Sequence, residues 1–373
     1  MARVLVLGAG MVGSAIARDL ASNHVVCIAD LNRDLLGELA SQGLDELMLD
    51  VTDRDALLRA VDRYDLVVGA VPGFVGFRTL ETIISTGKPV VDISFFPENA
   101  LSLDALARRT GSVAVVDAGI APGLDNLILG HHDRSMKVER FECLVGGLPK
   151  HRRWPFEYKA PFSPIDVIEL YTRPARFVEA GATVIRPALS DAELVHFDGV
   201  GTLEAFNTDG LRTLIATMPH IPYMKEKTLR YPGHIALIKA LQESGFFSEE
   251  EIEVNGALIK PLEFTSRLLM DHWHLEPNEP EFTIMRVTVE GKSGDKSERF
   301  VYDLYDEYDS ASGTSSMART TGYTCAAVAE LIINGHFSKI GVSPPEMVGR
   351  EVGCFGRVVG YLAERGVRLV LST

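Results

Sequence analysis

A glycine-rich turn near the start of the chain has the residue types that hold a diphosphate. Gly8, Gly10 and Gly13 form a G-x-G-x-x-G pattern that directly follows the apolar run at 4–7 and precedes the helix-like segment SAIARDLA. In such a turn the first glycine permits the bend, the second lets a pyrophosphate approach the backbone, and the third lets helix and strand pack closely. Backbone N–H groups and the positive helix end then face the phosphates, so we expect a dinucleotide here.

An acidic residue follows at the distance that suits the ribose of NAD. Asp30 ends the apolar run VVCIAD, twenty residues after Gly10, where a carboxylate accepts hydrogen bonds from the adenosine ribose. The carboxylate would repel a 2′-phosphate, so the pattern favours NAD over NADP, although Arg33 would contact a phosphate if the loop bent back. Alternatively, Asp30 is a solvated strand end or the cap of a helix from Asn32.

Two further strand ends belong to the same candidate site. Asp50 and Val51 close the third apolar run and are expected near the adenine, with a helix cap near Asp53 as the alternative role for this turn. The small residues after the fourth run would let the nicotinamide half approach, although an ordinary proline-containing loop is also possible. The expected coenzyme residues are Gly8, Gly10, Met11, Val12, Gly13, Asp30, Asp50, Val51, Ala70, Val71 and Pro72.

These residues need a parallel sheet to position them. The runs RVLVLG, VVCIAD, DELMLD, DLVVGA, PVVDIS and SVAVVD lie about 10 to 20 residues apart, with helical patterns between them. Their nearly continuous apolar character is typical of strands that are covered on both faces. We predict an α/β fold, a Rossmann doubly wound parallel sheet, over residues 1–126.

The rest of the chain predicts a second domain and a return to the first. Residues 127–312 contain longer, irregular segments, including the strand-like FECLVGGLP and FTIMRVTVEG, and a helix entered through Pro232-Gly233 and ended at Gly245. An inserted α+β domain is expected there. Residues 313–373 return to helical spacing and are expected to pack back on the first domain.

The composition of the chain disfavours some classes of binding partner. The net charge of −14 disfavours nucleic acid, and no apolar run approaches the length of a membrane span. The four cysteines have no paired spacing, and the first residues lead straight into the glycine turn without a cleavable signal. We therefore expect a soluble, cytoplasmic protein with reduced thiols.

Several segments together resemble a known family. GAGMVG, AVPGFVGF, DISFFPEN, DAGIAPGLDN, GGLPK, YTRPAR, DGLRT, TLRYPGH and SSMARTTGYT occur in this order. The chain resembles the saccharopine dehydrogenase-like family over nearly its whole length, and within it the lysine 6-dehydrogenases. The resemblance implies NAD-dependent oxidative deamination of the ε-amine of L-lysine to the semialdehyde, and a homodimer or higher oligomer formed in part by the inserted substrate domain. Saccharopine reductases usually read D-P-G where this chain has Ala121-Pro122-Gly123.

An amine releases hydride only when its nitrogen is unprotonated, so the site must contain a base or lower the ammonium pKa. His234 in RYPGH has a suitable intrinsic pKa and is a candidate to orient or deprotonate the amine, with a helix-capping histidine as the alternative. Asp92 and Asp117 stand at strand ends, where a carboxylate would attract an ammonium group or brace a turn.

A substrate carboxylate calls for an arginine fork. Arg212 in DGLRT, Arg230 in TLRYPGH and Arg173 in YTRPAR are the candidates, each of which could instead form a structural ion pair with Asp209 or Glu226. No metal is expected, because the pairs His131-His132 and His272-x-His274 lack further ligands at suitable spacing. Two other functions remain open: reduction of a saccharopine-type imine, and a non-catalytic NAD-binding regulator.

Overall fold

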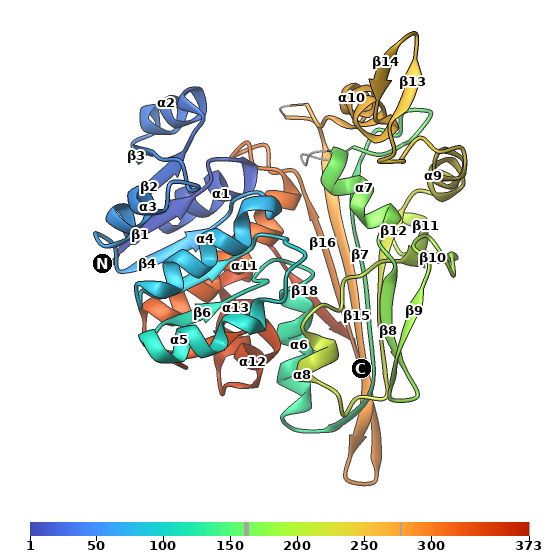
Figure 1. Cartoon of the computed structure of the whole chain (residues 1–373). Coiled ribbons are helices and arrows are strands. Elements are labelled where there is room, and N and C mark those ends of the chain that lie inside the picture. Colours follow the sequence, from blue (N-terminus) through green and yellow to red (C-terminus); the bar gives the residue numbers. More distant parts are fainter. Residues whose placement is uncertain (160–163, 277, 373) are drawn as a thin grey trace. The chain divides into compact units, whose positions relative to one another are not determined.

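The computed structural model describes residues 1–159, 164–276 and 278–372; for residues 164–166 it describes the backbone alone. The chain divides into two compact units (Figure 1). The first unit contains Met1–Lys137, Lys292–Lys296 and Met317–Leu369. The second contains Val138–Gly291, Ser297–Ser316 and the last residues from Val370. Each unit has a sheet of its own, so each is considered by itself.

The first unit has the parallel sheet that the apolar runs predict. Its order is β17-β6-β5-β4-β1-β2-β3, and neighbouring strands pair in parallel. Six strands coincide with the predicted runs, and β1 to β6 have the order of a doubly wound dinucleotide-binding sheet, so the predicted fold class is confirmed. The strands are β1 (Arg3–Leu7), β2 (Val25–Asp30), β3 (Asp45–Met48), β4 (Leu66–Gly69), β5 (Val90–Asp92), β6 (Val113–Val115) and β17 (Gly341–Ser343).

Helices connect these strands and bury their apolar residues against the sheet. Leu5, Leu7, Val67 and Val90 lie in the core with Leu80 and Ile83 of helix α4. This burial removes apolar surface from water, which is the main favourable term in folding. The helices are α1 (Met11–Leu20), α2 (Arg33–Ser41), α3 (Arg54–Val61), α4 (Gly73–Ser85), α5 (Asp104–Thr110) and α6 (Leu124–Asp133), with a 3-10 turn at Ala100–Leu103.

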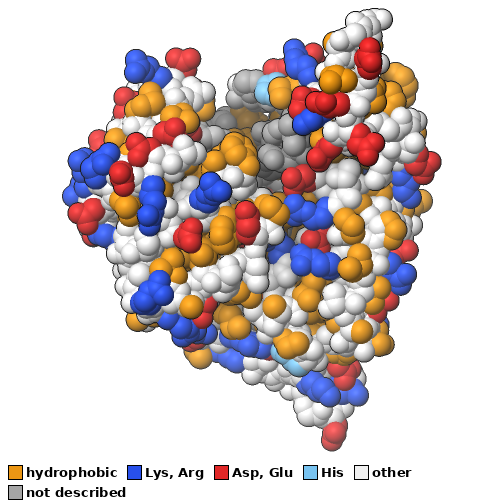
Figure 2. Space-filling view, in the orientation of Figure 1, with side chains coloured by type: hydrophobic (Ala, Val, Ile, Leu, Met, Phe, Trp, Pro, Cys, Tyr) orange, Lys and Arg blue, Asp and Glu red, His pale blue; other side chains and the backbone are white. Residues whose placement is uncertain are grey.

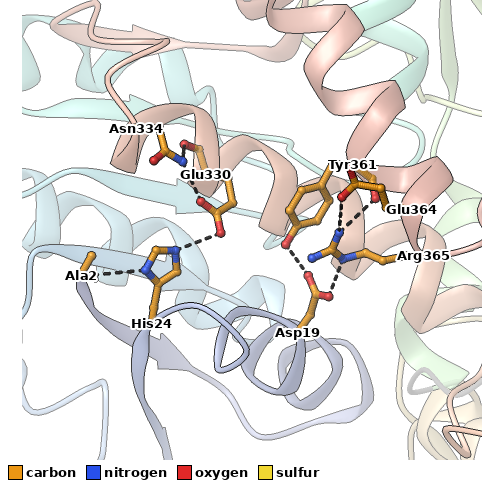
Figure 3. A network of polar contacts seen from close by, with 8 residues as sticks. All are labelled: Ala2, Asp19, His24, Glu330, Asn334, Tyr361, Glu364 and Arg365. Atoms are coloured by element: carbon orange, nitrogen blue, oxygen red, sulfur yellow. Dashed lines mark hydrogen bonds and ion pairs between the residues drawn. The ribbon is translucent and has the colours of Figure 1, made fainter.

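The C-terminal segment supplies α11 (Ser316–Ile333), β17, α12 (Pro345–Arg350) and α13 (Cys354–Glu364). Polar contacts of Asp19 and His24 join it to the N-terminal part of the same unit (Figure 3). Asp19 at the end of α1 accepts hydrogen bonds of 2.5 Å from Tyr361 Oη and Arg365 Nε. His24 Nδ1 accepts from the backbone N–H of Ala2, which leaves its Nε2–H to donate to Glu330 at 2.9 Å.

The second unit contains a mixed sheet of order β10-β11-β12-β7-β15-β16-β18, with β8 on β12 and β9 on β8. The predicted strand segments FECLVGGLP and FTIMRVTVEG lie in β7 and β15. The strands are β7 (Lys137–Pro149), β8 (Ala175–Glu179), β9 (Ala182–Arg186), β10 (Glu193–Phe197), β11 (Gly201–Asn207), β12 (Tyr223–Arg230), β15 (Glu281–Ser293), β16 (Lys296–Glu307) and β18 (Leu369–Ser372). A separate hairpin is formed by β13 (Ile252–Val254) and β14 (Ala257–Ile259).

The helices of this unit, over the described residues, are α7 (Pro164–Thr172), α8 (Leu214–Thr217), α9 (His234–Glu243) and α10 (Pro261–Trp273). Helix α9 begins directly after Pro232-Gly233, as predicted. Residues of α7, α9 and α10 share one apolar core with β11 and β12, including Tyr171, Phe206, Leu229, Ile235 and Trp273.

The visible surfaces of both units carry mixed charge. Figure 2 shows Lys and Arg side chains interspersed with Asp and Glu on the face in view. That face has no continuous basic surface of the kind that a nucleic-acid backbone would need. None of the helices in the described ranges has the length and hydropathy to cross a bilayer.

Candidate functional site

The glycine turn between β1 and α1 leaves room where a diphosphate would lie. A Cβ on Gly8, whose φ is +103°, would lie 2.3 Å from the carbonyl oxygen of Ala70, and one on Gly13 would lie 2.0 Å from that of Gly8. These two glycines therefore allow close packing within the protein. A Cβ on Gly10 would meet nothing within 4 Å. Gly10 is also the N-cap of α1 without a side-chain cap, so the start of this helix suits an anion.

Asp30 holds the second strand end against this turn. Its Oδ2 accepts a 2.6 Å hydrogen bond from the backbone N–H of Ala9, and its Oδ1 accepts one of 2.8 Å from that of Asn32. The cap of α2 is Asn32, whose Oδ1 accepts from the N–H groups of Asp34 and Leu35. The capping alternative for Asp30 therefore does not describe this structure. Arg33 is exposed at the first position of α2.

The third strand end differs from the prediction. Strand β3 ends at Met48, so Asp50 and Val51 lie in the following turn and do not close the strand. Thr52 donates its hydroxyl and its backbone N–H to Asp50 Oδ1, and these bonds lower the pKa of Asp50. The cap of α3 is Asp53, which accepts from the N–H of Ala56. Asp50 thus braces the turn.

The loop after β4 contacts the glycine turn directly. The N–H of Ala70 donates to the carbonyl of Leu7, and the Ala70 carbonyl lies against Gly8. Val71 is buried, and Pro72 is the N-cap of α4. The carboxyl ends of β1 and β4 are therefore in contact next to Gly10, where a Cβ would meet no protein atom within 4 Å.

Asp92 and Asp117 lie next to the ends of β5 and β6, within the same unit. Asp92 is 0% exposed, and its carboxylate accepts hydrogen bonds from the N–H and hydroxyl of Ser94. This is the turn-bracing geometry that the sequence left open. Asp117 is buried with a φ of +53°, a conformation that costs a non-glycine residue free energy and that clusters at functional sites.

In the second unit the structure brings two predicted residues together through one tyrosine. Nδ1 of His234 lies 2.8 Å from the carbonyl oxygen of Phe156 and its Nε2 lies 2.9 Å from Tyr171 Oη. Nδ1 must therefore carry the proton, and Nε2 accepts from Tyr171. The histidine is 3% exposed, and burial, aided by Arg230, lowers its pKa to about 3. Both ring nitrogens are engaged and the ring is neutral.

Arg230 contacts the same tyrosine. Its Nε–H donates to Tyr171 Oη at 3.1 Å and its Nη1 donates to the carbonyl of Leu229 at 2.8 Å. Its guanidinium carbon lies 4.1 Å from the centre of the Tyr158 ring. Arg230 is 3% exposed. Within the described residues, its guanidinium forms no ion pair with a carboxylate, and three of its five N–H groups have no acceptor.

An aromatic cluster completes this site, and sequence reasoning missed it. Trp273 of α10 lies 5.5 Å from Tyr158 and 6.1 Å from Tyr171, measured between ring centres. It is 1% exposed, and its Nε1–H has no acceptor among the described residues. Tyr171 begins the segment YTRPAR, in which the sequence drew attention to Arg173 instead; no local pattern marks Tyr158 or Trp273.

The other two predicted arginines lie on other segments of the second unit. Arg173 donates to Glu169 at 2.7 Å across one turn at the end of α7. Arg212 is half-buried in the turn that follows β11, with a φ of +42°. Asp209 is paired with Arg176, which donates to both carboxylate oxygens at 2.8 Å.

The histidine pairs are placed separately. His131 and His132 lie in α6, where His131 stacks on Phe355. His272 belongs to α10 and His274 follows its end. Over the described ranges, no group of three or more His, Cys, Asp or Glu side chains is arranged to hold a metal ion.

The sheet order and the glycine turn between β1 and α1 define a fold of the Rossmann dinucleotide-binding class. The chain belongs to the saccharopine dehydrogenase family: residues 4–115 match its "Saccharopine dehydrogenase NADP binding domain" and residues 119–367 its "Saccharopine dehydrogenase C-terminal domain". The protein is therefore a saccharopine dehydrogenase-like, NAD(P)-dependent amino-acid dehydrogenase. The predicted family is thereby confirmed.

Named relatives cover the chain to different extents. The saccharopine dehydrogenase [NADP(+), L-glutamate-forming] of Schizosaccharomyces pombe is 24% identical over 99% of this chain and 98% of that protein. The Saccharomyces cerevisiae protein of the same name is 26% identical, over 67% of this chain and 60% of that protein. A carboxyaminopropylagmatine dehydrogenase of Synechocystis is 20% identical over 92% of both. The apo Saccharomyces cerevisiae saccharopine dehydrogenase (L-Glu forming) structure covers 100% of this chain with a TM-score of 0.81 and 21% identity, which shows the shared fold.

Proposed function

We propose that this protein oxidises the ε-amine of L-lysine with NAD, and that Arg230 binds the substrate carboxylate. The observation that supports this most is the buried guanidinium of Arg230, which among the described residues has three N–H groups without an acceptor and no carboxylate at ion-pair distance. Burying an uncompensated charge is costly, so such a group is typical of a site for an anionic ligand. A planar fork suits a carboxylate through two parallel hydrogen bonds.

The ion pairs of three other cations in this unit favour a substrate with one carboxylate. Arg176 is paired with Asp209, Lys159 with Glu279 and Lys227 with Glu193. Arg230 differs from them, because no described residue forms an ion pair with it. L-Lysine carries one carboxylate, whereas saccharopine carries three and would need further cations.

The side chains around Arg230 fix its direction. Tyr171 accepts from Arg230 and donates to His234, and His234 in turn donates to the Phe156 carbonyl. We assign His234 to this positioning chain, because a neutral ring with both nitrogens engaged does not accept a proton from an amine. The ammonium-attracting role of Asp117 and Asp92 stays a prediction.

The coenzyme, when bound, accepts the hydride. The reaction written in full is R–CH₂–NH₃⁺ + NAD⁺ + H₂O → R–CHO + NADH + NH₄⁺ + H⁺, in which the C–H bond gives hydride and water supplies the aldehyde oxygen. Gly8, Gly10 and Gly13 would hold the diphosphate through the backbone, and Asp30 would bind the ribose. The Asp30 carboxylate favours NAD, whereas the relatives above are named for NADP(+).

Substitution of Arg230 tests the proposal. Arg230→Lys keeps the charge and removes the fork, so we expect the KM for L-lysine to rise about tenfold or more. The matched substrate is 1,5-diaminopentane, which is lysine without its carboxylate and whose KM should hardly change. An unchanged KM for L-lysine would overturn the assignment of Arg230.

Saccharopine oxidation is the second candidate, supported by the names of the relatives. Reduction of NAD⁺ or NADP⁺ with L-lysine or saccharopine as the donor separates the two. NADH formation with L-lysine alone supports our proposal, and activity with saccharopine alone replaces it. Coenzyme binding without turnover of either would indicate a non-catalytic regulator.

A further inference from the structure

A buried carboxyl group lies on the strand that carries Arg230. Glu226 of β12 is 4% exposed, and its Oε2 accepts a 2.6 Å hydrogen bond from Thr208 Oγ1 and its carboxyl group accepts from the backbone N–H of Gly210. A Cβ on Gly210 would lie 2.3 Å from Oε2 of Glu226. Glycine at position 210 therefore leaves the space that this carboxyl group fills. The functional assignments above do not use it.

Glu226, Thr228 and Arg230 occupy alternate positions of β12 and so share one face of the strand. Thr228 lies 2.9 Å from Thr208, and because Thr208 donates to Glu226, Thr228 must donate to Thr208. Glu226, Thr208 and Thr228 therefore form one chain of hydrogen bonds, and two of these residues share a strand face with Arg230. Glu226 and Arg230 do not form an ion pair but are close enough to interact electrostatically.

Two charged side chains act on Glu226, one from the loop after β11 and one from its own strand. Asp209 follows β11 and raises the pKa of Glu226, while Arg230 on β12 lowers it. Asp209 is itself held by Arg176 of β8. Burial has the largest effect and raises the pKa of Glu226, to about 7.

We propose that Glu226 takes up a proton when a substrate carboxylate binds to Arg230. This inference rests on the proposed role of Arg230. Two carboxylates and one guanidinium in a dry interior leave a net negative charge, whose burial is expensive. Protonation of Glu226 removes that excess, so carboxylate binding and proton uptake are coupled.

The coupling has a definite sign. A carboxylate on Arg230 weakens the stabilisation of ionised Glu226 and adds a like charge, so the pKa of Glu226 rises further in the complex. The protonated form therefore binds the carboxylate more tightly. Affinity for L-lysine should fall as pH rises from about 7 toward the higher pKa of the complex, roughly tenfold for each unit by which that pKa rises.

Calorimetry of L-lysine binding to the NADH-loaded enzyme, in buffers of different ionisation enthalpy at pH 8, measures the proton uptake. Wild-type enzyme should take up a fraction of a proton more than the Glu226→Gln variant, and 1,5-diaminopentane should show no such difference. Glu226→Gln should also remove the rise of KM with pH and lower the KM at pH 8.5 several-fold. Thr208→Val removes a hydrogen-bond donor to the Glu226 carboxylate, so the rise of KM for L-lysine should begin at a higher pH.

The outcomes distinguish the two proposals. If Arg230→Lys leaves L-lysine binding intact, the proposed function fails. If Arg230→Lys weakens binding but Glu226→Gln keeps the wild-type proton uptake and pH profile, the Glu226 inference alone is overturned. If Glu226→Gln does not fold, the Thr208→Val variant decides: a pH dependence of the KM for L-lysine equal to that of the wild type overturns the Glu226 inference.

Discussion

The two candidate sites recognise charge in opposite ways. At the start of α1, backbone N–H groups and missing side chains at glycines make the site, and Asp30 accepts a hydrogen bond from the backbone of the turn. At Arg230, side chains make the site, and Tyr171, His234 and Tyr158 hold a guanidinium in the interior. The coenzyme turn is encoded within about thirty residues, whereas the Arg230 cluster draws on segments far apart in the sequence.

This difference sets how each site responds to change. Backbone recognition fails when a side chain is added, because the added atoms occupy the space of the ligand. Side-chain recognition fails when an atom is removed, because buried partners are left without hydrogen bonds. The following predictions test this contrast, from the largest expected effect to the smallest.

Acid should destabilise the second unit through His234. Its pKa of about 3 in the folded state lies below the ordinary value of 6.5, so the unfolded state takes up the proton first and stability is lost as pH falls from about 6.5 to 3. The full effect is on the order of 5 kcal/mol. Urea unfolding as a function of pH measures it, and the His234→Gln variant is the control. An acid dependence identical in the variant would contradict the neutral, buried histidine.

Gly10→Ala should cost coenzyme affinity without affecting the fold. The added methyl meets no protein atom within 4 Å, so the Tm of the coenzyme-free protein should stay the same, while the diphosphate loses its approach to the backbone. We expect the Kd for NADH to rise about a hundredfold, or about 3 kcal/mol. Gly37→Ala, also open and in α2, is the matched control for fluorescence titration. A wild-type Kd for NADH in Gly10→Ala would show that the diphosphate does not bind at this turn.

Tyr171→Phe should destabilise the protein by about 2 kcal/mol, because it leaves Arg230 Nε–H and His234 Nε2 without their shared partner. Tyr158→Phe is the control, since Tyr158 contacts Arg230 through its ring face. Urea unfolding measures both variants. Equal losses for the two would show that the hydroxyl of Tyr171 has no special role.

Asp30→Asn should reduce the affinity for NAD about tenfold, or about 1.4 kcal/mol, and should not reduce that for NADP. Asp34→Asn removes an exposed carboxylate in the next helix and should leave both affinities unchanged. The two Kd values are compared by calorimetry. A loss for NADP as large as that for NAD would mean that Asp30 acts on the turn and not on the ribose.

Much of the first unit could be predicted from sequence because its signals are local. Continuous apolar runs marked β1, β2, β4, β5 and β6, and the glycine pattern marked the start of α1. The end of β3 was misplaced by two residues, since Leu49 and Asp50 continue the pattern of the strand while the backbone has already turned. Strand β17 was missed because three residues before two prolines have no periodicity to read.

The second site could be predicted only in part. The motif TLRYPGH pointed to Arg230 and His234, but the partners that decide their chemistry come from other segments. His234 looked like a base because its ordinary pKa suits one, and burial changes that pKa. Tyr158 and Trp273 became visible only when the fold placed them beside Tyr171.

The edge strand β17 has a consequence for synthesis on the ribosome. It pairs with β6, although more than two hundred residues separate them in the chain. The N-terminal sheet is therefore still incomplete while the second unit is being translated, and helices α11 to α13 can dock only near the end of synthesis. A nascent chain that stops at residue 137 would expose the edge of β6, which makes it a natural target for chaperones or aggregation.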